Sequence, residues 1–359
     1  MSGLAYRADW LAARERLTTW WNGGDIGRAA MQLFVPREEP VEEWEVPPAP
    51  EGWLCAYSTL DLEHHVRVRL PGVASQYCLG EAVAATNAGD LAPNCLALYQ
   101  GCHGLETDNS CWCEPFLEDL ESADFGYDAD NFYWNFTQAA IRRSLELGRG
   151  KFLQVFPDLI EGLDTLAAAR GTQNLLFDLI MQPEQVHRCL RQITDVYFHY
   201  YDMIYDLIRD EVGGSVFWAW APGRLAKLQC DFAAMISPEM FEEFMGPVLR
   251  HMTERVSYSL YHWDGPQAIP DKATLFNLPN LDCIQWQPGA GNAPIWDPCW
   301  FPIYHEAFDA GKKMMLSADS REHLRNYKRE FGDQCKQMII SGGTATVAEA
   351  EEWIKIMEE

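Results

Sequence analysis

The chain has 359 residues, in which 28 Lys and Arg stand against 53 Asp and Glu, so its formal net charge is −25 at pH 7. With 48% hydrophobic and 13% aromatic residues the chain can bury a large core, which excludes a disordered protein. The acid excess excludes nucleic acid and an anionic membrane as the main partner, because both require clustered Lys and Arg.

Three further features predict the cellular compartment. No apolar run approaches the roughly 20 residues that span a bilayer, and residues 1–10 lack the apolar core of a signal peptide. The eleven cysteines are odd in number and irregularly spaced, which is typical of reduced thiols. We therefore expect a cytoplasmic protein.

Residues 1–130 are predicted to form an N-terminal elaboration that packs onto the main body of the protein. Residues 29–34 are an apolar run, which we interpret as the first buried strand. Residues 36–50 are rich in Pro and Glu, which favours a solvated loop because proline removes hydrogen-bond donors and like charges repel. The rest of this segment is predicted to be irregular.

Residues 131–359 alternate between short apolar runs and longer helical patterns. Strands are predicted at 152–156, 215–220, 256–261, 281–286, 313–316 and 337–340, and helices at 132–147, 186–208, 266–276, 300–310 and 319–331, with two more beginning at Ser237 and Thr346. This alternation indicates parallel βαβ units. About eight such units, with no Gly-rich dinucleotide fingerprint, predict a TIM-type (β/α)8 barrel that includes the first strand and forms one structural domain.

In such a barrel the functional site lies at the carboxyl ends of the strands, where we find His262 and Asp264. Two residues apart on a strand, their imidazole and carboxylate point to the same side. The pair fits a divalent metal site or an acid–base pair. In the alternative interpretation a backbone group satisfies His262, and Asp264 caps the helix that begins at Pro266.

Two further features accompany this pair. Asp231 follows the strand-like segment 228–230 and is predicted to be an acid, a base or a ligand, unless it anchors the turn before Ser237. Four tryptophans and one amide stand near other strand ends: Trp218, Trp220, Trp263, Trp286 and Gln285. Their side chains predict a wall on which a flat substrate stacks, although tryptophans also serve as large core residues.

Several short motifs resemble, in order and spacing, the uroporphyrinogen decarboxylase superfamily over about residues 29–359. They are 163–171, 178–186, 231–241, His262-Trp263-Asp264-Gly265, Ile284-Gln285-Trp286 and Gly342-Gly343. That superfamily contains tetrapyrrole decarboxylases and zinc-dependent methyltransferases that work with corrinoid proteins. The resemblance implies a TIM-type barrel with one of these two activities.

Two departures from the superfamily pattern narrow the implied activity. The N-terminal part lacks the Arg-rich, Gly-containing loop by which the decarboxylases resemble one another, and a highly anionic substrate suits a chain of charge −25 poorly. The coenzyme M methyltransferases hold zinc with a His-x-Cys pair and a later Cys, where this chain has His262-x-Asp264 and Gly342-Gly343. A site of His and carboxylates also suits zinc, and O-demethylase relatives resemble it in using non-thiolate ligands.

The resemblance therefore implies transfer of a methyl group from an aryl methyl ether or methylamine-like donor to cobalamin on a separate corrinoid protein. Zinc would be held by His262 and Asp264, with Asp231 in support. The candidates for a further ligand are Cys299, Cys230, Glu81 and Asp231. Residues 1–130 are expected to cover the barrel mouth, and from this segment Glu81, His103 and 111–113 are the side chains that could reach the site.

Two other functions remain open from the sequence. A decarboxylase would use Asp231 to stabilise a protonated intermediate and would need no metal. A non-catalytic barrel would only bind an aromatic ligand or a corrinoid protein. The decarboxylase relatives resemble one another in forming dimers, which implies a homodimer.

Overall fold

A seven-stranded, mostly parallel sheet is the centre of the computed structural model, which describes residues 3–359. Its strands follow the order β2-β1-β13-β12-β11-β10-β9. They are β1 (Ala30–Pro36), β2 (Gln76–Gly80), β9 (Leu225–Gln229), β10 (Tyr258–Asp264), β11 (Cys283–Gln287), β12 (Lys313–Ser317) and β13 (Met338–Gly343). Every neighbouring pair is parallel except β1 and β2. The protein is therefore a mixed α/β fold.

Strand pairing does not close this sheet into a barrel within the described chain, so the expected closed (β/α)8 barrel is not confirmed. The free edge of β1 is taken by the antiparallel strand β2. The segments that would complete a barrel form separate pairs: β3 (Ala85–Thr86) with β6 (Leu153–Gln154), and β7 (Ser215–Phe217) with β8 (Ala219–Ala221). Each of these strands has only two or three residues, too few to continue a ladder.

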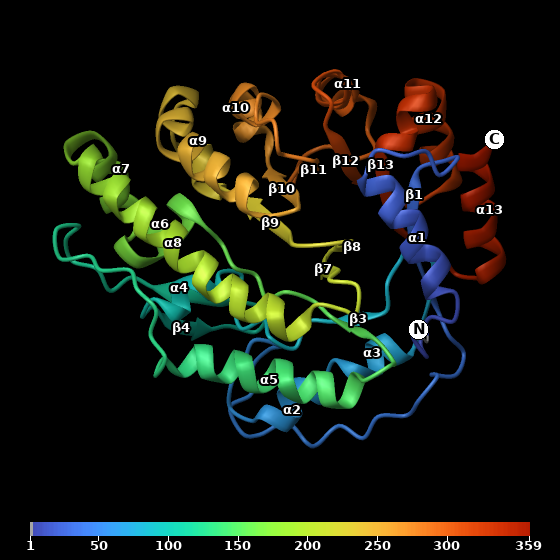
Figure 1. Cartoon of the computed structure of the whole chain (residues 1–359), viewed down its shortest axis with the longest axis horizontal. Coiled ribbons are helices and arrows are strands. Elements are labelled where there is room, and N and C mark those ends of the chain that lie inside the picture. Colours follow the sequence, from blue (N-terminus) through green and yellow to red (C-terminus); the bar gives the residue numbers. More distant parts are fainter. Residues whose placement is uncertain (1–2) are drawn as a thin grey trace.

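Helices follow the parallel strands in turn and cover the outer side of the sheet (Figure 1). They are α9 (Pro238–Arg255), α10 (Lys272–Phe276), α11 (Phe301–Asp309), α12 (Arg321–Phe331) and α13 (Val347–Glu358). The two predicted caps are confirmed, because Ser237 accepts a hydrogen bond from the Met240 amide and Thr346 from the Glu349 amide. The alternation predicted after residue 215 thus holds, with shifted boundaries.

A second group of helices comes from residues 62–208 and lies below the sheet in Figure 1. It contains α2 (Leu62–Arg67), α3 (Leu70–Ala74), α4 (Cys95–Tyr99), α5 (Phe132–Gly148), α6 (Gly162–Arg170), α7 (Thr172–Met181) and α8 (Pro183–Ile208). The long predicted helix is confirmed as α8, whose apolar stripe is buried. The β structure predicted at 215–220 is confirmed, but it forms two short antiparallel strands instead of one, because Trp218 lies at the turn between β7 and β8.

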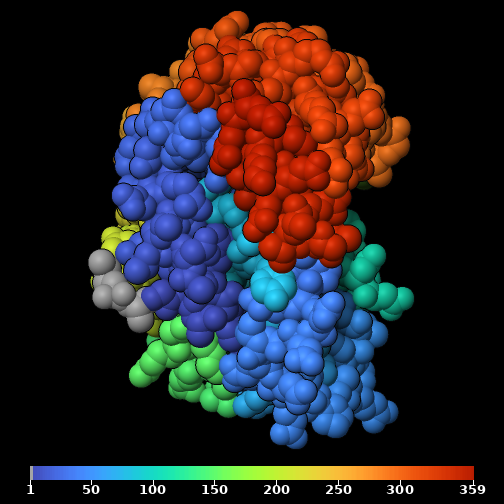
Figure 2. Space-filling model, turned by 90° about the vertical axis from the view of Figure 1, so that its right-hand side faces the viewer, coloured from blue at the N-terminus to red at the C-terminus, as the bar shows by residue number. Residues whose placement is uncertain are grey.

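The N-terminal segment is more regular than predicted. It contains α1 (Trp10–Trp21), in which Trp10, Trp20 and Trp21 are buried. The Trp20 indole donates to the carbonyl of Lys336, which brings the first and last parts of the chain together. Figure 2 shows this blue segment lying directly against the red C-terminal helices. Within residues 3–359 no helix has both the length and the apolar character needed to cross a bilayer.

One buried acid of this framework predicts a pH dependence of stability. Asp271 ends η2 (Pro266–Asp271), is 3% exposed, and burial raises its pKa to about 7. Because its unfolded pKa is about 4, the folded state alone holds this proton between pH 4 and 7, so the contribution of Asp271 to stability falls as the pH rises through that window. We expect Asp271→Asn to gain about 1–3 kcal/mol over the wild type at pH 8 and much less at pH 5.

Urea unfolding at both pH values measures this difference. Asp309→Asn is the matched control, because Asp309 is exposed in α11 and should change stability equally little at both pH values. Parallel pH profiles for the wild type and Asp271→Asn would show that Asp271 is ionised in the folded protein.

Candidate metal centre

Three of the predicted site residues come together at the carboxyl ends of β9 and β10. Asp231, His262 and Asp264 each offer one ligand atom, and these atoms all lie within 4.8 Å of one another. Within residues 3–359, this is the one group of three or more His, Cys, Asp and Glu side chains with such a geometry. The prediction that His262 and Asp264 share one face of a strand is confirmed.

Strand pairing explains why these side chains meet. Gln229 of β9 lies opposite His262 of β10, which in turn lies opposite Gln285 of β11. Alternate residues of a strand point to the same face, so Asp264 shares the face of His262. Asp231 begins η1 (Asp231–Met235) directly after β9 and reaches the same place from the neighbouring strand.

The imidazole of His262 is held by the side chain of Gln285, which was predicted to belong to the substrate wall. Nδ1 of His262 lies within a short hydrogen bond of Oε1 of Gln285, while Nε2 of Gln285 donates to the carbonyl of Trp286 at 3.1 Å. An amide oxygen only accepts, so Nδ1 carries the proton. The lone pair of Nε2 is then left for a metal or a proton.

Asp231 and Asp164 form a pair of neighbouring acids at the end of β9. Asp164 accepts hydrogen bonds from the backbone amides of Asp231 at 2.8 Å and Phe232 at 2.9 Å. Burial raises the pKa of Asp164 to about 6, and the charge of Asp231 adds to this effect. Restricted hydration likewise raises the pKa of Asp231, opposed by His262 and reinforced by Asp264. The functional interpretation of Asp231 is therefore supported by its neighbours.

Asp264 has a carboxylate oxygen without a partner. Its Oδ1 is buried and has no hydrogen bond among the described residues, and such an atom is costly unless something satisfies it. The alternative role as a helix cap is wrong, because η2 has Gly265 at its N-cap and no side-chain cap bond. A cation bound between Asp264 and its two neighbours would satisfy this oxygen.

The donor set fits zinc. One imidazole nitrogen and two carboxylate oxygens are ligands that Zn²⁺ accepts, and three protein ligands leave a fourth position for a substrate, as in catalytic zinc sites. His262 is half-buried and Asp231 is exposed, so the group opens to one side. These residues would hold the metal by their side chains alone.

A cavity of about 480 Å³ adjoins Asp231. Its walls include Asp164, Gln229 and Phe232, together with Ser110–Cys113 of the hairpin formed by β4 (His103–Glu106) and β5 (Cys111–Glu114). Trp112 of this hairpin is 66% exposed and forms one wall. The lining residues include no Lys, Arg or His. Residues 111–113, which were expected to reach the site, line this cavity, and His103 and Glu81 are not among its walls.

Trp218, which was predicted to belong to the substrate wall, lies against the imidazole of His262. Its ring is 5.4 Å from that of His262 in an edge-on arrangement, and the residue is 43% exposed. It adopts φ = 52° between β7 and β8, a conformation that a bulky residue rarely takes and that functional sites often contain. The Gln32 amide donates to the Trp218 carbonyl at 3.1 Å and helps to hold this turn.

The other three predicted tryptophans do not reach the site, so their assignment to the substrate wall is wrong. Trp220 is buried edge-on against Trp10, with its indole donating to Asp210. Trp263 and Trp286 are also fully buried, and their rings pack on each other at 4.9 Å. The alternation of strand residues places both on the face opposite His262 and Gln285.

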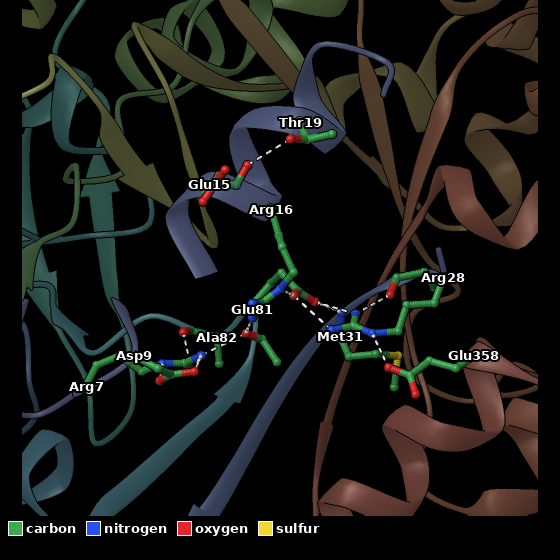
Figure 3. Close-up of polar contacts among 12 residues, drawn as sticks. Arg7, Asp9, Glu15, Arg16, Thr19, Arg28, Met31, Glu81, Ala82 and Glu358 are labelled. Carbon is green, nitrogen blue, oxygen red and sulfur yellow. Dashed lines mark hydrogen bonds and ion pairs between the residues drawn. The ribbon is translucent and has the colours of Figure 1, made fainter. Parts of the chain in front are cut away.

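Three of the predicted additional ligands are also elsewhere. Glu81 is fully buried and binds Arg28 at 2.7 Å, Arg16 at 2.6 Å and the Met31 amide at 2.7 Å, as Figure 3 shows. Burial alone would raise the pKa of Glu81, but the hydrogen bonds and charges of Arg28 and Arg16 lower it. Cys299 is exposed in η3 (Pro298–Trp300), Cys230 is buried, and neither belongs to the group of ligand atoms.

The sequence interpretation missed Lys227 as a polar residue behind the site. Lys227 is 2% exposed, pairs with Asp158, and donates to Oε1 of Gln229 at 2.5 Å. The amide of Gln229 then donates to Asp231 at 3.1 Å. Lys227 and Gln229 stand two residues apart in an otherwise apolar strand, and this spacing was the available signal that one face of β9 is polar.

Comparison with known proteins adds no relative: no family model and no curated protein matches the sequence.

Proposed function

We propose that this protein transfers a methyl group from a small organic donor to the cobalamin of a separate corrinoid protein. The observation that supports this proposal is the group of Asp231, His262 and Asp264, which opens beside a cavity without cationic side chains. The donor is an aryl methyl ether or a methylamine-like compound. The homodimer and the cytoplasmic location remain predictions of the same proposal.

We also propose that the sheet belongs to a TIM-type barrel. The parallel row from β9 to β13 continues into β1, and the Phe156 amide donates to the Val216 carbonyl at 3.0 Å, which links the segments after β6 and in β7. Both observations support a TIM-type barrel that is interrupted where β2 pairs with β1. In such a barrel the carboxyl ends of β9 and β10 belong to the catalytic face.

Methyl transfer requires stabilisation of the oxygen or nitrogen atom that loses the methyl group. When the methyl carbon moves to the nucleophile of the partner, the bonding electron pair stays on the oxygen or nitrogen, which is a poor leaving group unless a cation or a proton stabilises it. Bound zinc supplies a Lewis acid at this place. His262 would contribute Nε2, and Asp231 and Asp264 would contribute their carboxylates.

The cavity favours an uncharged or cationic donor over a carboxylated one. Asp164 and Asp231 give its polar wall a negative character, and its apolar wall includes Ile160, Phe232 and the Trp112 indole. A polycarboxylate such as a porphyrinogen would meet like charges and no cation among these residues. Methyl transfer is therefore favoured over the decarboxylase alternative.

Two measurements on the purified chain test the proposal. Metal analysis is expected to find about one zinc per chain, and addition of reduced cobalamin with an aryl methyl ether or a methylated amine is expected to give methylcobalamin, followed by its absorption spectrum. A chelator should abolish the reaction and zinc should restore it. A metal-free chain that releases carbon dioxide from a porphyrinogen would show a decarboxylase, and ligand binding without turnover would show a non-catalytic protein.

A further inference from the structure

We infer that Gln229 and Gln285 are positioning residues that hold Asp231 and His262 in the geometry for binding a divalent metal, and that Lys227 fixes the amide of Gln229. The inference deepens the proposed function and rests on its metal centre. None of the three side chains is proposed to touch the metal.

The register of three strands places both amides beside the imidazole. Gln229, His262 and Gln285 occupy directly opposed positions on β9, β10 and β11. Neighbouring strands lie about 4.8 Å apart, so side chains in such a row are in contact. One amide turns to His262, and the other turns to Asp231.

The orientation of the Gln285 amide is fixed by its second hydrogen bond. Its nitrogen donates to the Trp286 carbonyl, which cannot donate in return, so its oxygen must face Nδ1 of His262. The imidazole is thereby held in the tautomer that leaves Nε2 free to bind a metal. A histidine ligand commonly depends on such a partner for its second nitrogen.

The orientation of the Gln229 amide is fixed from the other side. The ammonium of Lys227 only donates, so the oxygen of Gln229 faces Lys227 and the nitrogen faces Oδ2 of Asp231. Lys227 is itself buried and held by Asp158, and it lies over the Phe217 ring at 5.3 Å. A continuous chain of contacts therefore runs from Asp158 to Asp231. If the Gln229 amide were reversed, its oxygen would face the carboxylate of Asp231, and the two acceptors would repel each other.

Metal affinity of the full-length protein tests the inference. Competition with a chromophoric chelator gives the dissociation constants for Zn²⁺ and Co²⁺, and the visible absorption of bound Co²⁺ reports its ligand geometry. We expect Gln285→Leu and Gln229→Leu to weaken binding of both ions by about 10–100-fold and to change the Co²⁺ spectrum. Gln285→Glu should restore the affinity, because a carboxylate also accepts from Nδ1 of His262.

Gln154→Leu is the matched control. Gln154 is a buried strand glutamine whose amide also donates to the carbonyl of the next residue, at 3.0 Å, but it contacts none of the three ligands. Lys227→Met should weaken metal binding as much as Gln229→Leu does. If the Lys227→Met variant fails to fold, Gln229→Leu alone tests the contacts that run from Lys227 to Asp231. Wild-type affinity in both glutamine variants, or equal losses in Gln154→Leu, would overturn the inference. Absence of metal binding by the wild type would instead contradict the proposed function.

Discussion

Replacing His262 with alanine is expected to abolish methyl transfer and to weaken zinc binding by more than about 100-fold. This loss exceeds the one expected when a residue that only positions a ligand is replaced. The imidazole is the one nitrogen ligand of the group, and two carboxylates alone hold zinc poorly. The protein should remain folded, because His262 is half-buried and its one hydrogen bond is to Gln285. Methylcobalamin formation, zinc content and thermal unfolding measure the three effects.

His305→Ala provides the matched control for this substitution. His305 is also half-buried and hydrogen-bonded to one side chain, Glu330 at 2.9 Å, but it lies on α11 outside the group of ligand atoms. It should keep wild-type activity and zinc content. If His262→Ala turned over the donor like the wild type, His262 would have no part in the chemistry and the proposed function would be wrong.

Replacing Glu81 with alanine is expected to lower the free energy of unfolding by about 3–5 kcal/mol, because its removal leaves the buried charge of Arg28 with the longer ion pair to Glu358 at 3.6 Å. Arg28 is 7% exposed and loses both of its contacts to the Glu81 carboxylate, and the Met31 amide loses its acceptor. Urea unfolding measures the loss. The zinc content of the folded variant should not change, because Glu81 is not part of the metal centre.

Glu63→Ala is the control that shows whether burial of the carboxylate causes the loss of stability. Glu63 also pairs with two arginines, Arg67 and Arg143, but its side chain is 42% exposed. Such exposed pairs contribute about 0–1 kcal/mol each. A loss below 1 kcal/mol for Glu81→Ala would mean that the Arg28 charge is solvated, and a loss of zinc would restore Glu81 as a ligand.

The meeting of the three candidate metal ligands could be predicted because it depends on local rules. His262 and Asp264 share a face by strand periodicity, and Asp231 follows the neighbouring strand. The same periodicity, applied to Trp263 and Trp286, would have placed both on the opposite face. Their residue type alone suggested a substrate wall, whereas their position in the strand determines the face on which each tryptophan lies.

Features that depend on distant contacts could not be predicted. Glu81 meets Arg28 across 53 positions of the sequence, and no local pattern shows that the two arginines around it occupy its oxygens. The missing closure of the sheet has a similar cause, because β3 and β6 are two residues long and leave no periodic signal. Helix α1 is fixed by the indoles of Trp20 and Trp21, which donate to the carbonyls of Lys336 and Trp220, and no local pattern shows these distant contacts.

The pairing of β1 with β13 has a consequence for how the chain folds. Ala30 lies opposite Ile339, so two adjacent strands come from positions more than 300 residues apart. Bringing such remote segments together carries a large entropic cost, and folds of this kind assemble slowly. During synthesis the apolar β1 must wait for its parallel neighbour until β13 has left the ribosome. In that interval β2 protects only one of its two edges, and chaperones that bind exposed strands would act on the other.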